Sequence, residues 1–169
     1  MAETVSGFLN RFFSPEFVVF LVSLLPVLEL RGGMIAAALF NVPWHWAIII
    51  AIAGNALPIY FIIAFIEHLL KRMKEMKPLA GIARWVEDKG AKQGALLAKD
   101  YPAQLYLGLM LFVAVPLPGT GAWTGALITS ALGLDPKKSG LFISLGIILD
   151  GIFMSVVTYL IPALFSHAF

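Results

Sequence analysis

Two ionisable residues, Glu29 and Arg31, interrupt one of the most apolar runs of this sequence. Residues 17–28 carry no charge, and residues 32–66 carry none if His45 is neutral. A charged side chain at the centre of a bilayer costs from about 3 to more than 10 kcal/mol, so it persists only in a specific environment and usually marks a function. Any fold of this chain must therefore give both charges such an environment.

The motif at residues 28–33 (LELRGG) predicts an unwound turn within the membrane. Side chains two residues apart on a helix point to different faces, so Glu29 and Arg31 would not share an environment there. Gly32 and Gly33 tolerate irregular backbone, which at membrane depth is found where it lines a cavity or is buried in protein. The alternative is a buried ion pair that only holds two helices together.

The composition indicates one domain of an integral membrane protein. Hydrophobic residues make up 60% and charged residues 13% of the 169 residues, and the mean hydropathy is +0.89. Soluble domains are closer to half apolar and a quarter charged. The absence of cysteine excludes disulfides and thiolate chemistry. Because no histidine or carboxylate spacing suits a metal, we expect neither a metal nor a cofactor.

The first half of the chain predicts a re-entrant hairpin and one full span, after an interfacial helix at residues 1–15. A helix at residues 17–28 would be about 18 Å long, against about 30 Å of hydrocarbon. Residues 34–40 are shorter still, and residues 41–43 (NVP) end them. Two half-length pieces around a polar tip describe a hairpin that enters and leaves on one side. Residues 46–66 then have spanning length.

The second half repeats this pattern. Short apolar runs at residues 105–115 and 122–134 flank a tip at residues 116–121 (PLPGTG). Residues 135–138 are expected to form a turn, and residues 140–161 a second span. Short segments broken by glycine and proline in matching places of two halves are typical of transporters with internal repeats. The predicted fold is all-α, with two inverted repeats at residues 17–66 and 105–162 and a basic loop at residues 67–104.

The positions of the basic residues indicate the topology. Most lysines and arginines lie between Lys71 and Lys99, and Lys137 and Lys138 follow the second hairpin. Re-entrant hairpins place both basic segments in the cytoplasm, in agreement with the positive-inside rule, and both termini outside. We expect a multi-pass protein of the inner (plasma) membrane whose hairpin tips meet near the midplane. Its neighbours are membrane lipids, and we expect no nucleic-acid partner.

The two tips predict an anion-binding site. A half-helix that begins inside the membrane points free N–H groups and its dipole at a ligand. Thr120 is placed to cap the helix at residues 122–134, while Arg31 supplies a guanidinium suited to phosphate. For the second tip alone, the alternative is a tight turn between helices. The candidate substrate-binding residues are Arg31, Gly32, Gly33, Pro118, Gly119, Thr120 and Gly121.

Three polar residues at mid-membrane depth, Glu29, Asn55 and Asp150, are candidates for proton or ion coupling. Asp150 lies about 16 Å into its span by helix rise, and Asn55 has a similar depth in the first span. A carboxyl in apolar surroundings can change its protonation near neutral pH. The alternative for Asp150 is a counter-ion to Arg31. No nucleophile or metal motif accompanies these residues, so we expect no enzyme activity.

Residues 28–33 (LELRGG) and 116–125 (PLPGTGAWTG) resemble the prokaryotic small multidrug export protein family, with similarity over roughly residues 17–162. The two-hairpin plan is also similar to the DedA/VTT membrane proteins. That similarity implies movement of lipids such as polyprenyl phosphates, with Glu29 and Arg31 as the acidic and basic residues of the first hairpin. Those proteins carry further arginine in the second hairpin, whereas this sequence has none after Arg84.

We expect a transporter of an anionic, polyprenyl-phosphate-like lipid or another phosphate-bearing amphiphile, coupled through Glu29 and Asp150. One alternative is efflux of small hydrophobic or cationic compounds, with both carboxylates binding the cargo. The other alternative is a non-transporting scaffold, which the glycines of the last span would suit because they favour helix packing. So small a core leaves hairpin surface to cover, which favours a homodimer.

Overall fold

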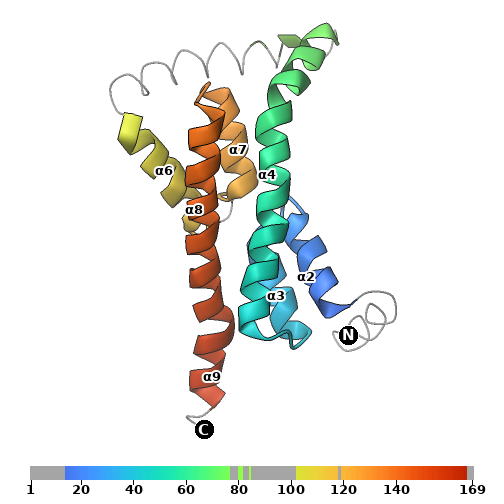
Figure 1. Cartoon of the computed structure of the whole chain (residues 1–169), viewed down its shortest axis with the longest axis vertical. Helices are drawn as coiled ribbons and strands as arrows, with labels where there is room; N and C mark the ends of the chain where they lie inside the picture. The colour runs from blue at the N-terminus through green and yellow to red at the C-terminus, as the bar shows by residue number, and fades with distance from the viewer. Residues whose placement is uncertain (1–13, 77–79, 82–83, 85–101, 118, 167–169) are drawn as a thin grey trace. The chain divides into compact units, whose positions relative to one another are not determined.

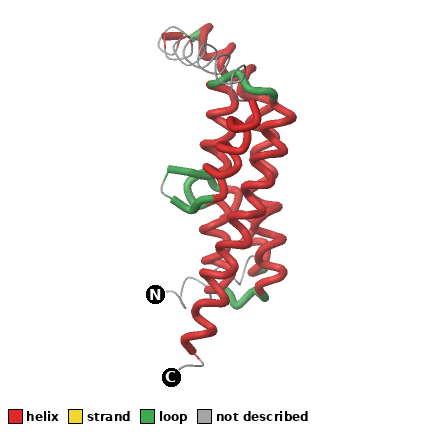
Figure 2. Tube along the Cα trace, turned by 90° about the vertical axis from the view of Figure 1, so that its left-hand side faces the viewer, coloured by secondary structure: helices red, strands yellow, loops and turns green. Residues whose placement is uncertain are grey.

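A computed structural model describes residues 14–76, 80–81, 84, 102–117 and 119–166 (Figure 1). These residues form helices and turns, and the described part contains no strand (Figure 2). The predicted all-α class is therefore confirmed. The predicted interfacial helix and most of the predicted basic loop lie outside the described residues.

The chain divides into two compact units. Unit 1 comprises the described residues up to Leu57 and those from Ile147 onward, and unit 2 extends from Pro58 to Gly146. Unit 1 contains the hairpin of α2 (Pro15–Leu24) and α3 (Glu29–Leu39), and unit 2 contains the hairpin of α6 (Pro102–Ala114) and α7 (Ala122–Ala131). Each unit also holds part of both long helices, because the unit boundaries fall inside them.

The two long helices are α4 (Trp44–Glu75) and α8 (Pro136–Ser155), and α8 continues through the π-helix η1 (Val156–Leu160) into α9 (Ile161–Ser166). Both have the length and apolar composition to cross a membrane, over Trp44–Phe65 and Pro136–Leu164. Only 28% and 39% of these segments is buried inside the structure. Most of their apolar surface faces outward, which suits a lipid environment. The two predicted spans are confirmed in length and composition.

Two predicted boundaries are wrong. The polar loop does not begin at residue 67, because α4 continues to Glu75. Helix-forming residues with charged side chains can extend a helix beyond its apolar segment. The predicted turn at residues 135–138 is the first turn of α8, since Asp135 precedes the helix and its Oδ1 accepts the Lys138 N–H at 2.8 Å. Proline at the first helical position after an aspartate cap is a helix start.

In unit 1, three helices meet at the buried residue Ser23. A Cβ atom at Gly33 of α3 would overlap the Ser23 hydroxyl. One at Gly54 of α4 would lie 2.9 Å from the Ser23 Cβ and 2.7 Å from the carbonyl oxygen of Phe20. The Ser23 hydroxyl donates to the Val19 carbonyl at 2.8 Å, so its polar group is satisfied within α2. Figure 1 shows the resulting arrangement of α2 and α3 beside the first part of α4.

The hairpin of unit 2 repeats this packing. A Cβ atom at Gly125 of α7 would lie 2.9 Å from the Val113 side chain of α6. One at Gly146 of α8 would lie 2.7 Å from the carbonyl oxygen of Met110, three residues before Val113. Val113 therefore occupies the place in unit 2 that Ser23 occupies in unit 1, with one glycine from the hairpin partner and one from a long helix.

The second helices of the two hairpins also end alike. Asn41 after α3 and Gly133 after α7 both have left-handed backbone, with φ of 57° and 59°. The next N–H, of Val42 or Leu134, closes each helix end with a 2.9 Å bond to a carbonyl five residues earlier. The long helix of each half then begins three residues after the left-handed residue. Each of these helix-end residues in the first half lies 92 residues before its counterpart in the second half.

The turn between α3 and α4 is fastened to η1. The Tyr159 hydroxyl donates to the Val42 carbonyl oxygen at 2.9 Å. We expect Tyr159→Phe to lower the free energy of unfolding by about 0.5–1.5 kcal/mol, because it removes one hydrogen bond without opening a large cavity. Unfolding of the purified protein in detergent, followed by circular dichroism, measures this. An unchanged unfolding midpoint would contradict a stabilising role for this bond.

Candidate functional site

The tip of the unit 1 hairpin holds Glu29 in an unusual backbone conformation. Leu25 is extended before Pro26, which cannot continue α2, and α3 begins at Glu29. Glu29 has a φ of +49°, and its side chain is only 5% exposed. A residue other than glycine in this region costs about 1–3 kcal/mol, and such residues gather at functional sites. Sequence reasoning did not predict this strain.

The unwound turn predicted at residues 28–33 is wrong for all of them but Leu28. Arg31, Gly32 and Gly33 lie within α3, and the break in the chain is earlier, at residues 25–28. The two glycines serve packing instead: a Cβ atom at Gly32 would lie 2.6 Å from the Leu28 Cβ, and Gly33 closes on α2. Proline ends the first helix, and the glycines allow the second helix to pack closely against it.

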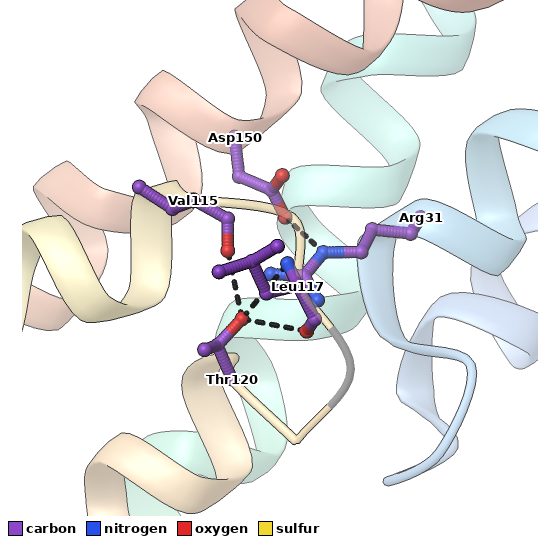
Figure 3. Close-up of polar contacts among 5 residues, drawn as sticks. All are labelled: Arg31, Val115, Leu117, Thr120 and Asp150. Carbon is purple, nitrogen blue, oxygen red and sulfur yellow. Dashed lines mark hydrogen bonds and ion pairs between the residues drawn. The ribbon is translucent and has the colours of Figure 1, made fainter.

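Helix α3 brings Arg31 to Asp150 of α8. The Nε atom of Arg31 donates to Oδ2 of Asp150 at 3.1 Å (Figure 3). The Arg31 side chain is 19% exposed and that of Asp150 only 2%. Asp150 is thus a counter-ion to Arg31, which is the role that the sequence analysis gave as the alternative to coupling. A role in coupling stays a prediction.

Two buried oxygens of unit 1 have no hydrogen-bond partner among the described residues: Oδ1 of Asp150 and Oδ1 of Asn55. Asn55 is 1% exposed. Helices α4 and α8 meet where Ile48 and Ile52 contact Gly151, and Asn55 follows Ile52 by one turn on the same face of α4. A buried acceptor needs a donor, so each of these oxygens can accept a hydrogen bond from water or from a ligand. The carboxylate oxygen of Asp150 can also take a proton.

The buried charges of unit 1 do not balance. Glu29 and Asp150 are buried carboxyls, and Arg31 is the single lysine or arginine in the described part of unit 1. We call these three residues the charge cluster. With two carboxylates and one guanidinium it is net negative when fully ionised, so it favours a proton or a cation over a further anion. The described residues contain no group of three metal-ligating side chains.

The prediction that Thr120 caps α7 is wrong. Its hydroxyl lies 2.7 Å from the Val115 carbonyl oxygen and 2.8 Å from that of Leu117, and it accepts the Leu117 N–H at 3.2 Å (Figure 3). The residue before α7 is Gly121, which has no side chain to cap the helix. Thr120 is one residue too early and closes the turn after α6.

The glycines of this second tip have the backbone freedom that the sequence indicated. Gly119 and Gly121 have φ of 83° and 137°, a region that other residues rarely adopt. Pro118 lies outside the described residues. The geometry around Thr120 fits the tight-turn alternative, and a meeting of this tip with Arg31 stays a prediction.

Sequence reasoning missed two cavities in unit 2. An apolar groove of about 450 Å³ lies between α6 and α7, and a polar cavity of about 390 Å³ lies at the end of α7 and the start of α8. Leu134 lines both. The one signal in the sequence is Asp135, an acidic residue directly after an apolar run and within the predicted turn at residues 135–138.

Comparison with known proteins identifies one family. A family model with the description "Putative small multi-drug export protein" matches residues 29–153, well over half of the 169 residues. The matched segment begins at Glu29 and includes the whole charge cluster and Asn55. No curated protein and no solved structure matches the chain. The similarity to DedA/VTT proteins is not among these matches and stays a prediction.

Proposed function

The chain belongs to the small multidrug export protein family, and we propose that it is a membrane transporter that exports small hydrophobic compounds, cations among them. Two helices of spanning length and composition support the membrane setting. The observation that carries the proposal is the ion pair between Arg31 and Asp150. Charged residues in so apolar a chain persist where a function needs them.

We also propose that the fold consists of two inverted repeats with re-entrant hairpins in the inner (plasma) membrane. The matching glycine contacts and helix ends of the two units support an internal repeat. Helices α2 and α7 have 10 residues each, which corresponds to about 15 Å, or half the hydrocarbon thickness. With the basic loop and the start of α8 in the cytoplasm, this plan obeys the positive-inside rule.

In this proposal Asp150 is the coupling residue. Arg31 holds Oδ2, while Oδ1 accepts a proton or the positive charge of a cargo molecule. Glu29 adds the second negative charge, and Asn55 supplies an amide oxygen on the facing helix. A proton or cation at Asp150 weakens its attraction to Arg31, so the occupied and empty states differ in the contact between α3 and α8.

Transport by the reconstituted protein tests this proposal. Proteoliposomes with a pH gradient are supplied with ethidium, a fluorescent hydrophobic cation, and its accumulation is followed. Asp150→Asn keeps the side-chain shape and removes the charge, and we expect it to slow accumulation at least about tenfold, the equivalent of about 1.4 kcal/mol. Glu16→Gln, at an exposed acid of α2, is the matched control and should transport normally. Wild-type rates with Asp150→Asn would refute the coupling role.

The anionic lipid is the second candidate cargo. The observation in its favour is the partial exposure of Arg31, whose guanidinium suits phosphate. The net negative charge cluster opposes it. Movement of a labelled polyprenyl phosphate, but not of a neutral lipid, in the same proteoliposomes would favour this cargo. A folded protein that moves neither lipid nor ethidium would favour the scaffold, and a homodimer stays a prediction.

A further inference from the structure

We propose that unit 2 carries a binding site for a hydrophobic cation, formed by the apolar groove between α6 and α7 and by Asp135 at its end. This inference rests on the proposed export function, because it names the class of compound and the place where that compound first binds. It concerns residues outside the charge cluster, so the two proposals can fail separately.

The groove has the size and lining for an apolar molecule. Its volume of about 450 Å³ falls within the range of small-molecule sites, about 300–1,000 Å³. Gly108 of α6 contributes open space, since no described atom lies within 4 Å of a Cβ built there. Gln104 is the single polar residue among those that line the groove. The remaining lining residues are Leu105, Gly108, Leu109 and Phe112 of α6, Ile128 and Leu132 of α7, and Leu134.

The adjoining cavity supplies acceptors and one negative charge. Its polar lining consists of Thr129, Ser130 and Asp135, and Asp135 is the one charged residue that lines either cavity in the described structure. The Thr129 hydroxyl donates to the Gly125 carbonyl at 3.0 Å, so its oxygen is left to accept. Lys137 and Lys138 are exposed and line neither cavity.

Asp135 is held at the end of the groove. Its N–H donates to the Tyr106 hydroxyl at 3.3 Å, which connects the residue to α6, the helix that forms one side of the groove. The Tyr106 ring packs against Phe142 of α8, with centroids 5.5 Å apart. One carboxylate oxygen accepts the Lys138 N–H, which fixes the orientation of the group. Leu134, 6% exposed, lines both the groove and the polar cavity and directly precedes Asp135, so a charge attached to an apolar body in the groove lies within reach of the carboxylate.

The charge of the lining selects the class of ligand. Asp135 is exposed beside the groove, and a cation at its carboxylate gains electrostatic attraction, whereas an anion of the same shape is repelled. A neutral compound gains only the burial of its apolar surface. The expected ligand is therefore an amine, ammonium or phosphonium group on an apolar body.

Tetraphenylphosphonium and tetraphenylborate test this assignment, because they have nearly the same shape and opposite charge. Binding of each to the full-length protein in nanodiscs is measured by equilibrium dialysis, with empty nanodiscs as the blank. We expect saturable binding of the cation and at least about tenfold weaker binding of the anion, the equivalent of about 1.4 kcal/mol. Equal binding of both, or binding no greater than to empty nanodiscs, would overturn the site.

Two variants locate the site. Asp135→Asn keeps a residue that can cap α8 and removes the charge, so it should abolish the preference for the cation. Gly108→Leu fills the groove while replacing a glycine within a helix by a good helix former, and it should weaken binding of both ions. Glu75→Gln, at an exposed acid, and Leu107→Phe, on an exposed face of α6 outside the groove, are the matched controls. They should bind like wild type.

Asp150→Asn separates this site from the proposed function. It should keep the preference for tetraphenylphosphonium over tetraphenylborate that Asp135→Asn abolishes, while its transport of ethidium is at least about tenfold slower. If Asp150→Asn loses the preference for the cation and Asp135→Asn keeps it, the unit 2 site is overturned and the coupling role remains. If Asp135→Asn loses the cation preference but wild type transports nothing, the site stands and the transporter is overturned.

Discussion

Replacing Arg31 with leucine is expected to lower the free energy of unfolding by about 3–5 kcal/mol, because it leaves a buried carboxylate without its partner. Asp150 is 2% exposed, so water cannot take the place of the guanidinium without a change in packing. Asp150→Leu should have a comparable cost, since it leaves Arg31 without this counter-ion in an apolar unit. Unfolding of each variant in detergent gives the two free energies.

The double variant Arg31→Leu/Asp150→Leu separates a structural role from a functional one. Replacement of a buried ion pair by apolar residues is often neutral or stabilising, so the double variant should recover most of the lost stability. The difference between its cost and the sum of the single costs is the interaction energy of the pair. Ethidium transport is measured on the same preparations.

Recovery of stability without transport is the result that the proposed function requires. Recovery of both would show that the pair only joins α3 to α8, which was the structural alternative from the sequence. A single Arg31→Leu variant that unfolds like wild type would contradict the buried ion pair itself.

Gly54→Ala is expected to lower the free energy of unfolding by about 1–3 kcal/mol, the usual cost of forcing extra volume into a packed core. Its Cβ atom would lie 2.7 Å from the Phe20 carbonyl oxygen, so backbone has to move. Gly146→Ala should cost a similar amount, because its Cβ atom would lie equally close to the Met110 carbonyl oxygen. Gly54→Leu should prevent α2 from packing at all.

Gly108→Ala is the matched control for these glycine variants. It lies within α6 with no described atom within 4 Å of a new Cβ, so it should raise stability by up to about 1 kcal/mol through helix propensity. The same unfolding measurement, followed by circular dichroism, serves for all of them. If Gly54→Ala is as stable as Gly108→Ala, the close approach of α2 and α4 is contradicted.

The charge and hydropathy of the sequence predicted the membrane-spanning segments and the break before the first of them. Both spans follow from apolar length, and the break at residues 41–43 follows from Asn41, which adopts the left-handed backbone, and Pro43. The contact between Arg31 and Asp150 was predicted as one of two roles, because few charged partners exist in so apolar a chain. These features depend on composition over long stretches, which a sequence displays directly.

Features that depend on local register could not be predicted in this way. The glycines at positions 32 and 33 suggested a turn, but they pack α3 against α2, and Pro26 makes the turn. Thr120 misses the capping position of α7 by one residue. The backbone strain at Glu29 and the cavity at Asp135 lie at helix ends, and no periodic pattern of the sequence encodes them.

The contact at Ser23 also limits how unit 1 can move. Because Gly33 and Gly54 both approach α2 closely, a slide of one helix by a residue or more would bring a larger side chain against Ser23 or the Phe20 carbonyl oxygen. A transport cycle in unit 1 therefore has to bend the chain elsewhere. The candidate for such a hinge is the segment η1, where the helical hydrogen-bond ladder is already irregular. The three helices would then travel as one rigid block.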